Sequence, residues 1–122
     1  MNTKTPSIFA APHGPRLAYH KTTGKAPTVV MFGGLMSDMT GTKATYLEDL
    51  CEKKGRGYIR FDYSGHGQSS GAFRDGTIGS WVQDGLSVID NLTEGPVVLV
   101  GSSLGGWLIL LAALARPDRV KG

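Results

Sequence analysis

Pro96-Val97-Val98-Leu99-Val100-Gly101-Ser102-Ser103-Leu104-Gly105-Gly106-Trp107-Leu108-Ile109-Leu110 is the stretch that decides the fold. Four apolar residues, three of them β-branched, lead into a glycine–serine turn, and a second apolar run follows. A continuous apolar run bounded by turn formers is typical of a buried strand. We therefore expect a strand, a very tight turn and a helix here.

The turn has the spacing Gly101-x-Ser103-x-Gly105. This pattern is typical of a nucleophile elbow, in which a sharp strand-to-helix turn holds a serine hydroxyl clear of the backbone. The residues two before and two after must be small, because neighbouring backbone closes in there. The spacing therefore favours Ser103 over Ser102 as a nucleophile. The alternative is an ordinary turn of a parallel sheet, in which Ser103 caps the helix.

Composition limits the kinds of protein this chain can be. Its 122 residues suffice for one small domain with a core. Hydrophobic residues make up 40% and charged residues 19%, as in soluble globular proteins. The net charge of +3 is spread along the chain, so we expect no nucleic-acid partner. The single cysteine, Cys51, excludes an internal disulfide and falls in a helical apolar pattern.

We expect no signal for export or membrane insertion in this sequence. Residues 1–15 are polar and broken by proline, unlike a signal peptide. The longest apolar run, 107–115, is too short to span a membrane. We therefore expect no membrane span and a cytoplasmic location.

The order of the expected elements predicts an α/β fold. Strands expected at 7–10 and 16–20 form an N-terminal hairpin, and strands at 28–32, 58–61 and 96–100 are each followed by a helix. The helices are expected at 42–54, 77–91 and from Leu104 to about Arg116, with Thr77 as a cap of the second. Val120 is expected to begin a further strand. Three βα units after a hairpin predict a mostly parallel sheet with right-handed crossovers.

The helix expected at 42–54 has an apolar face and a polar one. Its inner face is expected to hold Ala44, Leu47, Leu50 and Cys51. Its outer face is expected to hold Glu48, Asp49 and Glu52.

A second glycine turn, Gly33-Gly34-Leu35, directly follows the strand at 28–32. The carboxyl ends of parallel strands are where open α/β sheets place ligand sites. An oxyanion hole would combine the backbone N–H of Leu104 with one from the Gly34–Leu35 turn. Gly33 and Gly34 in this turn, and Gly101 and Gly105 in the other, are the expected supporting glycines.

The sequence provides no histidine after Ser103, although a serine nucleophile needs a base. The only acid after it is Asp118. We expect His13 and His20 to be surface residues and His66 to bond locally within its loop, with a working base as its alternative role. We interpret Asp62 as a carboxylate that orients this loop. The histidines and the cysteine show no metal-ligand spacing.

Three segments carry a resemblance to a known family. They are Gly33-Gly34-Leu35-Met36-Ser37-Asp38-Met39-Thr40-Gly41-Thr42-Lys43-Ala44, Ile59-Arg60-Phe61-Asp62-Tyr63-Ser64-Gly65-His66-Gly67 and Val100-Gly101-Ser102-Ser103-Leu104-Gly105-Gly106-Trp107. The chain resembles the N-terminal half of an α/β-hydrolase over about residues 15–122. More narrowly, it is similar to the subgroup of mitochondrial palmitoyl-protein thioesterases and acyl-glucuronide esterases, with their bacterial relatives.

The resemblance implies Ser103 as nucleophile, with the Leu35 and Leu104 N–H groups as the oxyanion hole. It implies a small-molecule acyl ester or thioester, or an acylated protein, as the substrate, and no cofactor. The family's acid and histidine would lie beyond residue 122. We therefore expect residues 1–122 to be the N-terminal portion of a single α/β-hydrolase domain, truncated and inactive by itself. The alternative is a non-catalytic α/β-hydrolase-like fragment or pseudoenzyme.

Overall fold

The structure, a computed structural model, describes residues 5–122. Strands and helices alternate along most of this range. The elements are β1 (Ser7–Ala10), β2 (Arg16–Thr22), β3 (Lys25–Phe32), α1 (Thr42–Lys53), β4 (Arg56–Phe61), a short 3-10 helix η1 (Phe73–Asp75), α2 (Ile78–Leu92), β5 (Val97–Gly101) and α3 (Leu104–Ala115).

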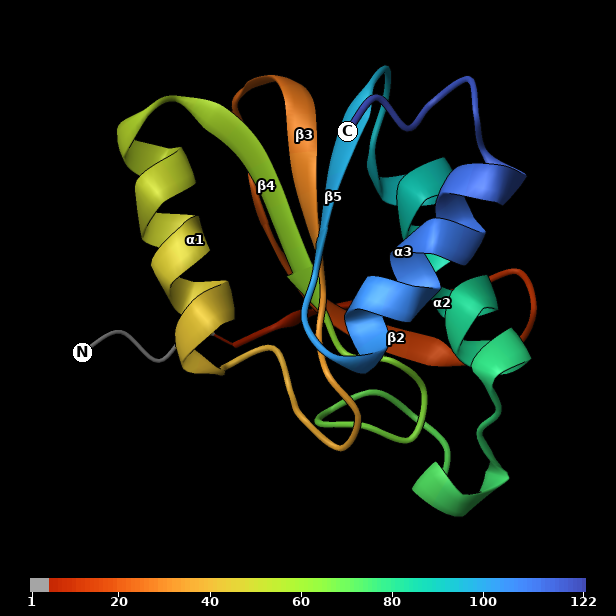
Figure 1. Ribbon diagram of the computed structural model, residues 1–122. Coiled ribbons are helices and arrows are strands. Elements are labelled where there is room, and N and C mark those ends of the chain that lie inside the picture. The colour runs from red at the N-terminus through yellow and green to blue at the C-terminus, as the bar shows by residue number, and fades with distance from the viewer. Residues whose placement is uncertain (1–4) are drawn as a thin grey trace.

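The strands of the described range form one sheet in the order β1-β2-β4-β3-β5. β2 is antiparallel to β1 and to β4, whereas β3 is parallel to both β4 and β5. Figure 1 shows α1 on one face of this sheet and α2 and α3 on the other. The predicted hairpin and three βα units are confirmed, and the hairpin makes the sheet a mixed one.

Most element boundaries lie close to their predicted positions. Thr77 caps α2 as predicted: its hydroxyl accepts from the Ser80 N–H at 3.0 Å, and the Ser80 hydroxyl accepts from the Thr77 N–H at 2.8 Å. The strand predicted at Val120 is a single parallel bridge to Val97. β3 begins three residues earlier than predicted, because Lys25 pairs with Arg56 of β4 ahead of a register shift.

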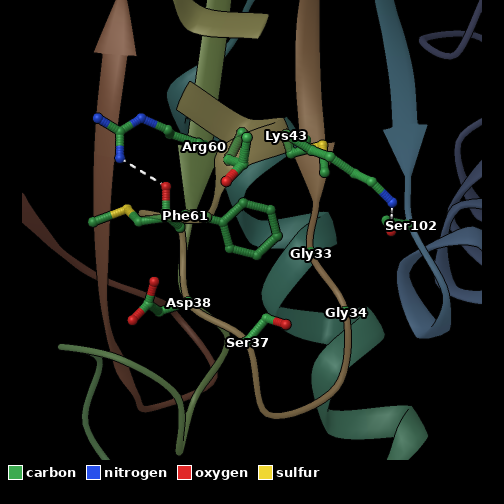
Figure 2. A pocket seen from close by; sticks show the side chains of 13 residues that line it. Gly33, Gly34, Ser37, Asp38, Lys43, Arg60, Phe61 and Ser102 are labelled. Atoms are coloured by element: carbon green, nitrogen blue, oxygen red, sulfur yellow. Dashed lines mark hydrogen bonds between the residues drawn. The ribbon is translucent and has the colours of Figure 1, made fainter. Parts of the chain in front are cut away.

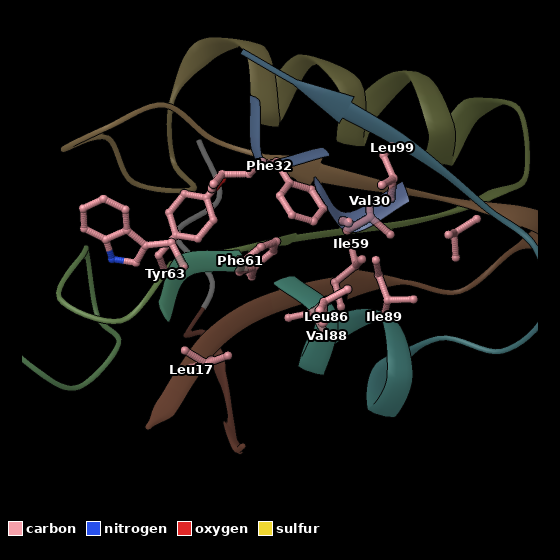
Figure 3. Close-up of a cluster of buried hydrophobic side chains, with 14 of the residues drawn as sticks. Leu17, Val30, Phe32, Ile59, Phe61, Tyr63, Leu86, Val88, Ile89 and Leu99 are labelled. Atoms are coloured by element: carbon pink, nitrogen blue, oxygen red, sulfur yellow. The ribbon is translucent and has the colours of Figure 1, made fainter. Parts of the chain in front are cut away.

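The core lies on both faces of the central strands, and Figure 3 shows the larger of its two clusters. Because successive side chains of a strand point to opposite faces, Val30 and Phe32 of β3 pack towards α2 and α3, whereas Met31 packs towards α1. The larger cluster contains Leu17, Ile59, Phe61, Tyr63, Leu86, Val88, Ile89, Leu99 and Leu108 among others. This double coverage fixes the carboxyl ends of β3 and β5 side by side.

Two predicted orientations in α1 are wrong. Glu48, expected on the outer face, is buried, because its carboxylate accepts two hydrogen bonds of 3.1 Å from the Arg60 guanidinium on β4. Arg60 is also buried, and it donates to the Met39 carbonyl at 2.8 Å. Leu50, expected inside, is 37% exposed, whereas Cys51 is buried as expected. The ion pair with Arg60 sets the orientation of α1 about its own axis, with the Glu48 carboxylate facing the sheet.

We expect Glu48→Ala to lower the free energy of unfolding by about 3–5 kcal/mol, because it leaves the Arg60 charge buried without its partner. Glu52→Ala, at an exposed position of the same helix, is the matched control and should change it by less than about 0.5 kcal/mol. Urea unfolding followed by circular dichroism measures both. Equal effects of the two substitutions would contradict a structural role for the pair.

Candidate active site

Ser103 lies in the turn between β5 and α3, at the carboxyl edge of the sheet. Its backbone has φ 58° and ψ −119°, a conformation that residues other than glycine rarely adopt. Within the described residues its side chain makes no capping hydrogen bond to α3, and the residue is exposed. The hydroxyl of Ser103 therefore does not cap α3.

Close backbone contacts explain the glycines that flank this serine. A Cβ on Gly105 would collide with the Phe32 carbonyl of β3, and one on Gly101 would collide with the Gly105 carbonyl. By contrast, a Cβ on Gly106 would meet nothing within 4 Å. The first turn of α3 is thus pressed against the end of β3, and this contact sets the sharpness of the turn at Ser103.

The Gly33-Gly34-Leu35 turn lies beside Ser103, as the sequence predicted for two glycine turns at one sheet edge. A Cβ on Gly34 would lie 3.5 Å from the Ser102 carbonyl oxygen and 3.7 Å from the Ser103 Cβ. The turn is closed by a 3.2 Å hydrogen bond from the Ser37 N–H to the Gly34 carbonyl. Gly33, by contrast, has open space where a Cβ would be.

The N–H groups at the start of α3 lie in the turn that carries Ser103. The N–H groups of Gly105 and Gly106 donate to the carbonyls of Ser102 and Ser103, each at 2.9 Å. The Leu104 N–H precedes them and belongs to the first turn, where N–H groups have no acceptor within the helix. The positive end of the helix dipole adds to the attraction of this edge for negative charge.

A cavity of about 310 Å³ lies between the 33–43 segment and the sheet (Figure 2). Its wall is apolar at Met31, Met39 and Phe61, and it has polar groups at Asp38 and Lys43. Figure 2 shows the Lys43 side chain reaching across to Ser102, and its ammonium group donates to the Ser102 hydroxyl at 3.1 Å. The sequence predicted no role for Lys43, although this residue lies in the Gly33–Ala44 segment that carries the resemblance.

Asp62 holds its own loop and the neighbouring one together. Its carboxylate accepts from the Met39 N–H at 2.7 Å and from the Gln68 N–H at 3.0 Å. Burial raises the pKa of the Asp62 carboxyl, and these two hydrogen bonds oppose that rise. The contacts support its interpretation as a loop-orienting carboxylate.

His66 and His13 are engaged in separate contacts. The His66 Nε2 accepts from the Met36 N–H at 3.1 Å, so His66 bonds to the glycine-turn segment and not only within its own loop. His13 is exposed, as expected of a surface residue, and it also bonds through Nε2 to the fully buried Asp84 at 2.7 Å. Asp84 was missed, although an acidic residue three positions after Trp81 in the apolar stripe of α2 signals a buried partner.

The described residues were also expected to contain neither a metal site nor a membrane-spanning helix. No group of three histidine, cysteine, aspartate or glutamate residues within 5–122 is arranged to hold a metal ion. No helix within this range is both long enough and apolar enough to cross a membrane.

The model of the alpha/beta hydrolase family matches residues 29–122. The chain belongs to this family. It is 51% identical over 114 residues to the protein of Bos taurus named mitochondrial palmitoyl-protein thioesterase ABHD10, and this match covers 93% of the chain and 37% of that protein. The chain thus spans little more than a third of the length of this curated relative.

Two solved structures agree with this assignment. Alpha/beta hydrolase domain-containing protein 10 from mouse superposes with a TM-score of 0.92 at 46% identity, over 96% of this chain and 47% of the other. A putative hydrolase from Agrobacterium vitis gives a TM-score of 0.84 at 38% identity, over 98% and 49%. Both the predicted fold and the predicted likeness to the thioesterase subgroup are confirmed.

The comparison overturns the expected cytoplasmic location. The curated relatives that are 51% identical to this chain over the 114 matched residues are named as mitochondrial proteins. The cytoplasmic prediction rested on the lack of a recognisable signal in residues 1–15, which was a weak basis for it.

We expect Gly105→Ala to lower the free energy of unfolding by at least about 1–3 kcal/mol. The new methyl group would meet the backbone carbonyls of Phe32 and Gly33, and neither can move freely. Gly106→Ala, one residue further along the same helix, has open space and should raise it by about 0.5–1 kcal/mol through helix propensity. Thermal unfolding of the two variants checks this difference in sign. A Gly105→Ala protein as stable as the parent would show that the turn has room to relax.

Proposed function

We propose that this chain carries the nucleophile and the oxyanion hole of a serine hydrolase that cleaves carboxylic esters or thioesters of acyl groups. The observation that carries the proposal is the backbone conformation of Ser103, which has φ 58° although it is not glycine. Its hydroxyl lies at the start of α3 but makes no capping hydrogen bond. A non-glycine residue keeps such a costly conformation when the surrounding structure enforces it, and these residues cluster at active sites. The capping alternative for Ser103 loses its support.

In the proposed reaction the Ser103 oxygen attacks the acyl carbonyl carbon, and a base takes the serine proton. The N–H groups of Leu35 and Leu104 donate to the oxyanion of the tetrahedral intermediate. The carbon–oxygen or carbon–sulfur bond then breaks, and the alcohol or thiol leaves with the proton while the acyl group stays on Ser103. Attack by water, with the same proton transfers, releases the carboxylic acid and restores the serine.

The base is not part of the proposal for these 122 residues. In this family the histidine follows the nucleophile in sequence, and no histidine follows Ser103 here. His13 is bonded to Asp84 and His66 to Met36. Because the chain spans 37% of the length of its curated relative, the activity is proposed for the complete product of the gene.

The surroundings of the glycine turn support an acyl group as the substrate. Leu35 and Met36 are 47% and 75% exposed beside Ser103. Met31 and Met39 add flexible apolar surface in the adjoining cavity. The relative's name as a palmitoyl-protein thioesterase agrees with a long acyl chain, and the proposal includes both small acyl esters or thioesters and acylated proteins.

We further propose that the described residues belong to a single α/β-hydrolase domain. All five strands within 5–122 share one sheet, and the larger hydrophobic cluster joins the hairpin to α2 and α3.

A fluorophosphonate probe tests the nucleophile directly in the complete gene product, because it reacts with activated serine hydroxyls. We expect Ser103→Ala to abolish labelling and to lower kcat for an acyl thioester by at least about 10⁴-fold. Ser102→Ala removes the neighbouring hydroxyl and should keep the label. Labelling that survives Ser103→Ala would refute the assignment of this serine, and a folded parent protein that takes no label would refute the proposed activity.

A further inference from the structure

The segment that carries Leu35 is anchored from outside by residues at and after the end of β4. The Met36 N–H donates to His66 Nε2 at 3.1 Å, and the Met39 N–H donates to the Asp62 carboxylate at 2.7 Å. Arg60, the penultimate residue of β4, donates to the Met39 carbonyl at 2.8 Å. These contacts connect the Asp62–His66 segment to the glycine turn.

The hydrogen bonds of His66 define which of its nitrogens carries the proton. Nδ1 lies 3.1 Å from the Ser64 carbonyl oxygen, and a carbonyl can only accept, so Nδ1 must be the donor. Nε2 receives the Met36 N–H and must therefore present its lone pair. The ring is thus a neutral imidazole protonated on Nδ1, with both of its nitrogens engaged.

Aromatic packing fixes the position of this ring. His66 is only 4% exposed. It makes edge contacts with Tyr63, Phe73 and Trp81, at centroid distances of 5.4, 5.3 and 5.4 Å. A ring held on three sides presents its acceptor nitrogen at one place and in one direction.

The anchored residue is itself in a costly conformation. Met36 has φ 59°, a left-handed backbone conformation that side chains other than glycine rarely adopt. Its N–H belongs to the peptide bond that directly follows the Cα of Leu35, and the Ser37 N–H closes the same turn on Gly34 at 3.2 Å. The Gly34 carbonyl and the Leu35 N–H belong to the same peptide group, which is held by the bond from Ser37. The next peptide group is held by the bond from Met36 to His66, so the Leu35 N–H has little freedom to rotate.

We propose that His66 is a positioning residue: through its acceptor bond to Met36 it directs the Leu35 N–H towards the oxyanion. The inference rests on the proposed function of Ser103 and Leu35. In this arrangement the Nε2 lone pair is committed to a backbone N–H, so His66 does not act as the base for Ser103. The role accounts for a histidine that the proposed reaction otherwise leaves unused.

The tautomer can be measured in the unsubstituted complete gene product, without any variant. Long-range ¹H–¹⁵N correlation spectra of the protein with ¹⁵N-labelled histidine distinguish protonated from unprotonated ring nitrogens. We expect the His66 signals to show a protonated Nδ1 and an unprotonated Nε2. A protonated Nε2 would overturn the proposal, because it could not accept from Met36. This outcome does not depend on catalysis, so it separates failure of this inference from failure of the proposed function.

Two substitutions then test the effect on catalysis. His66→Phe keeps an aromatic ring in the cage but removes the acceptor, and we expect kcat to fall by about 100-fold, the effect of misplacing a catalytic group by about 1 Å. KM should change by less than about threefold, because the oxyanion donor acts mainly in the transition state. His66→Gln offers an amide oxygen to Met36 and an amide N–H to Ser64, and it should recover kcat at least about tenfold over His66→Phe.

The pattern across the two variants separates positioning from mere stability. Unchanged kcat in a folded His66→Phe protein would overturn the proposal. So would equal losses of kcat in His66→Phe and His66→Gln that follow their losses in thermal stability. Should neither variant fold, the ring protonation of the unsubstituted protein decides alone.

Discussion

The carbonyl group of Phe32 lies where a side chain at position 105 would have to be, and the geometry of the site depends on this contact. Glycine at 105 allows α3 to begin against the end of β3, and glycine at 101 allows α3 to turn back over β5. The cost of the sharp turn is concentrated in Ser103, whose positive φ is compensated by the packing of the elements on either side. Buried side chains such as Phe32 and Leu108 supply that packing.

A second constraint holds the opposite wall of the site. The segment after β3 has no regular secondary structure until α1 begins, and its own backbone hydrogen bonds, such as that from the Ser37 N–H to the Gly34 carbonyl, close only local turns. Residues at and after the end of β4 position it instead, because Arg60 binds the carbonyl of Met39, Asp62 binds its N–H, and His66 binds the N–H of Met36. Because β4 pairs with β3 in the sheet, the two walls share one rigid support.

The sequence predicted the features that depend on local pattern. Apolar runs located the strands, Thr77 marked the start of α2, and the spacing of Gly101, Ser103 and Gly105 located the sharp turn. Periodicity predicts which face of an element is apolar, and it fails where a distant partner makes a polar group fit inside. The position of Glu48 could not be predicted correctly, because a helical pattern contains no information about Arg60 on the next strand.

The same reasoning explains what was missed at the site. The contacts of His13 with Asp84 and of Lys43 with Ser102 join residues 71 and 59 positions apart, and no local pattern relates such pairs. His66 was correctly expected to bond within its loop, yet only the fold brings its second nitrogen to Met36. The two residues other than glycine with positive φ in the described range, Ser103 and Met36, lie in neighbouring turns, and each is held by contacts with residues at or after the end of a strand. Such strained residues hold their position only while the sheet edge stays rigid, which ties the geometry of the turns to the stability of the whole fold.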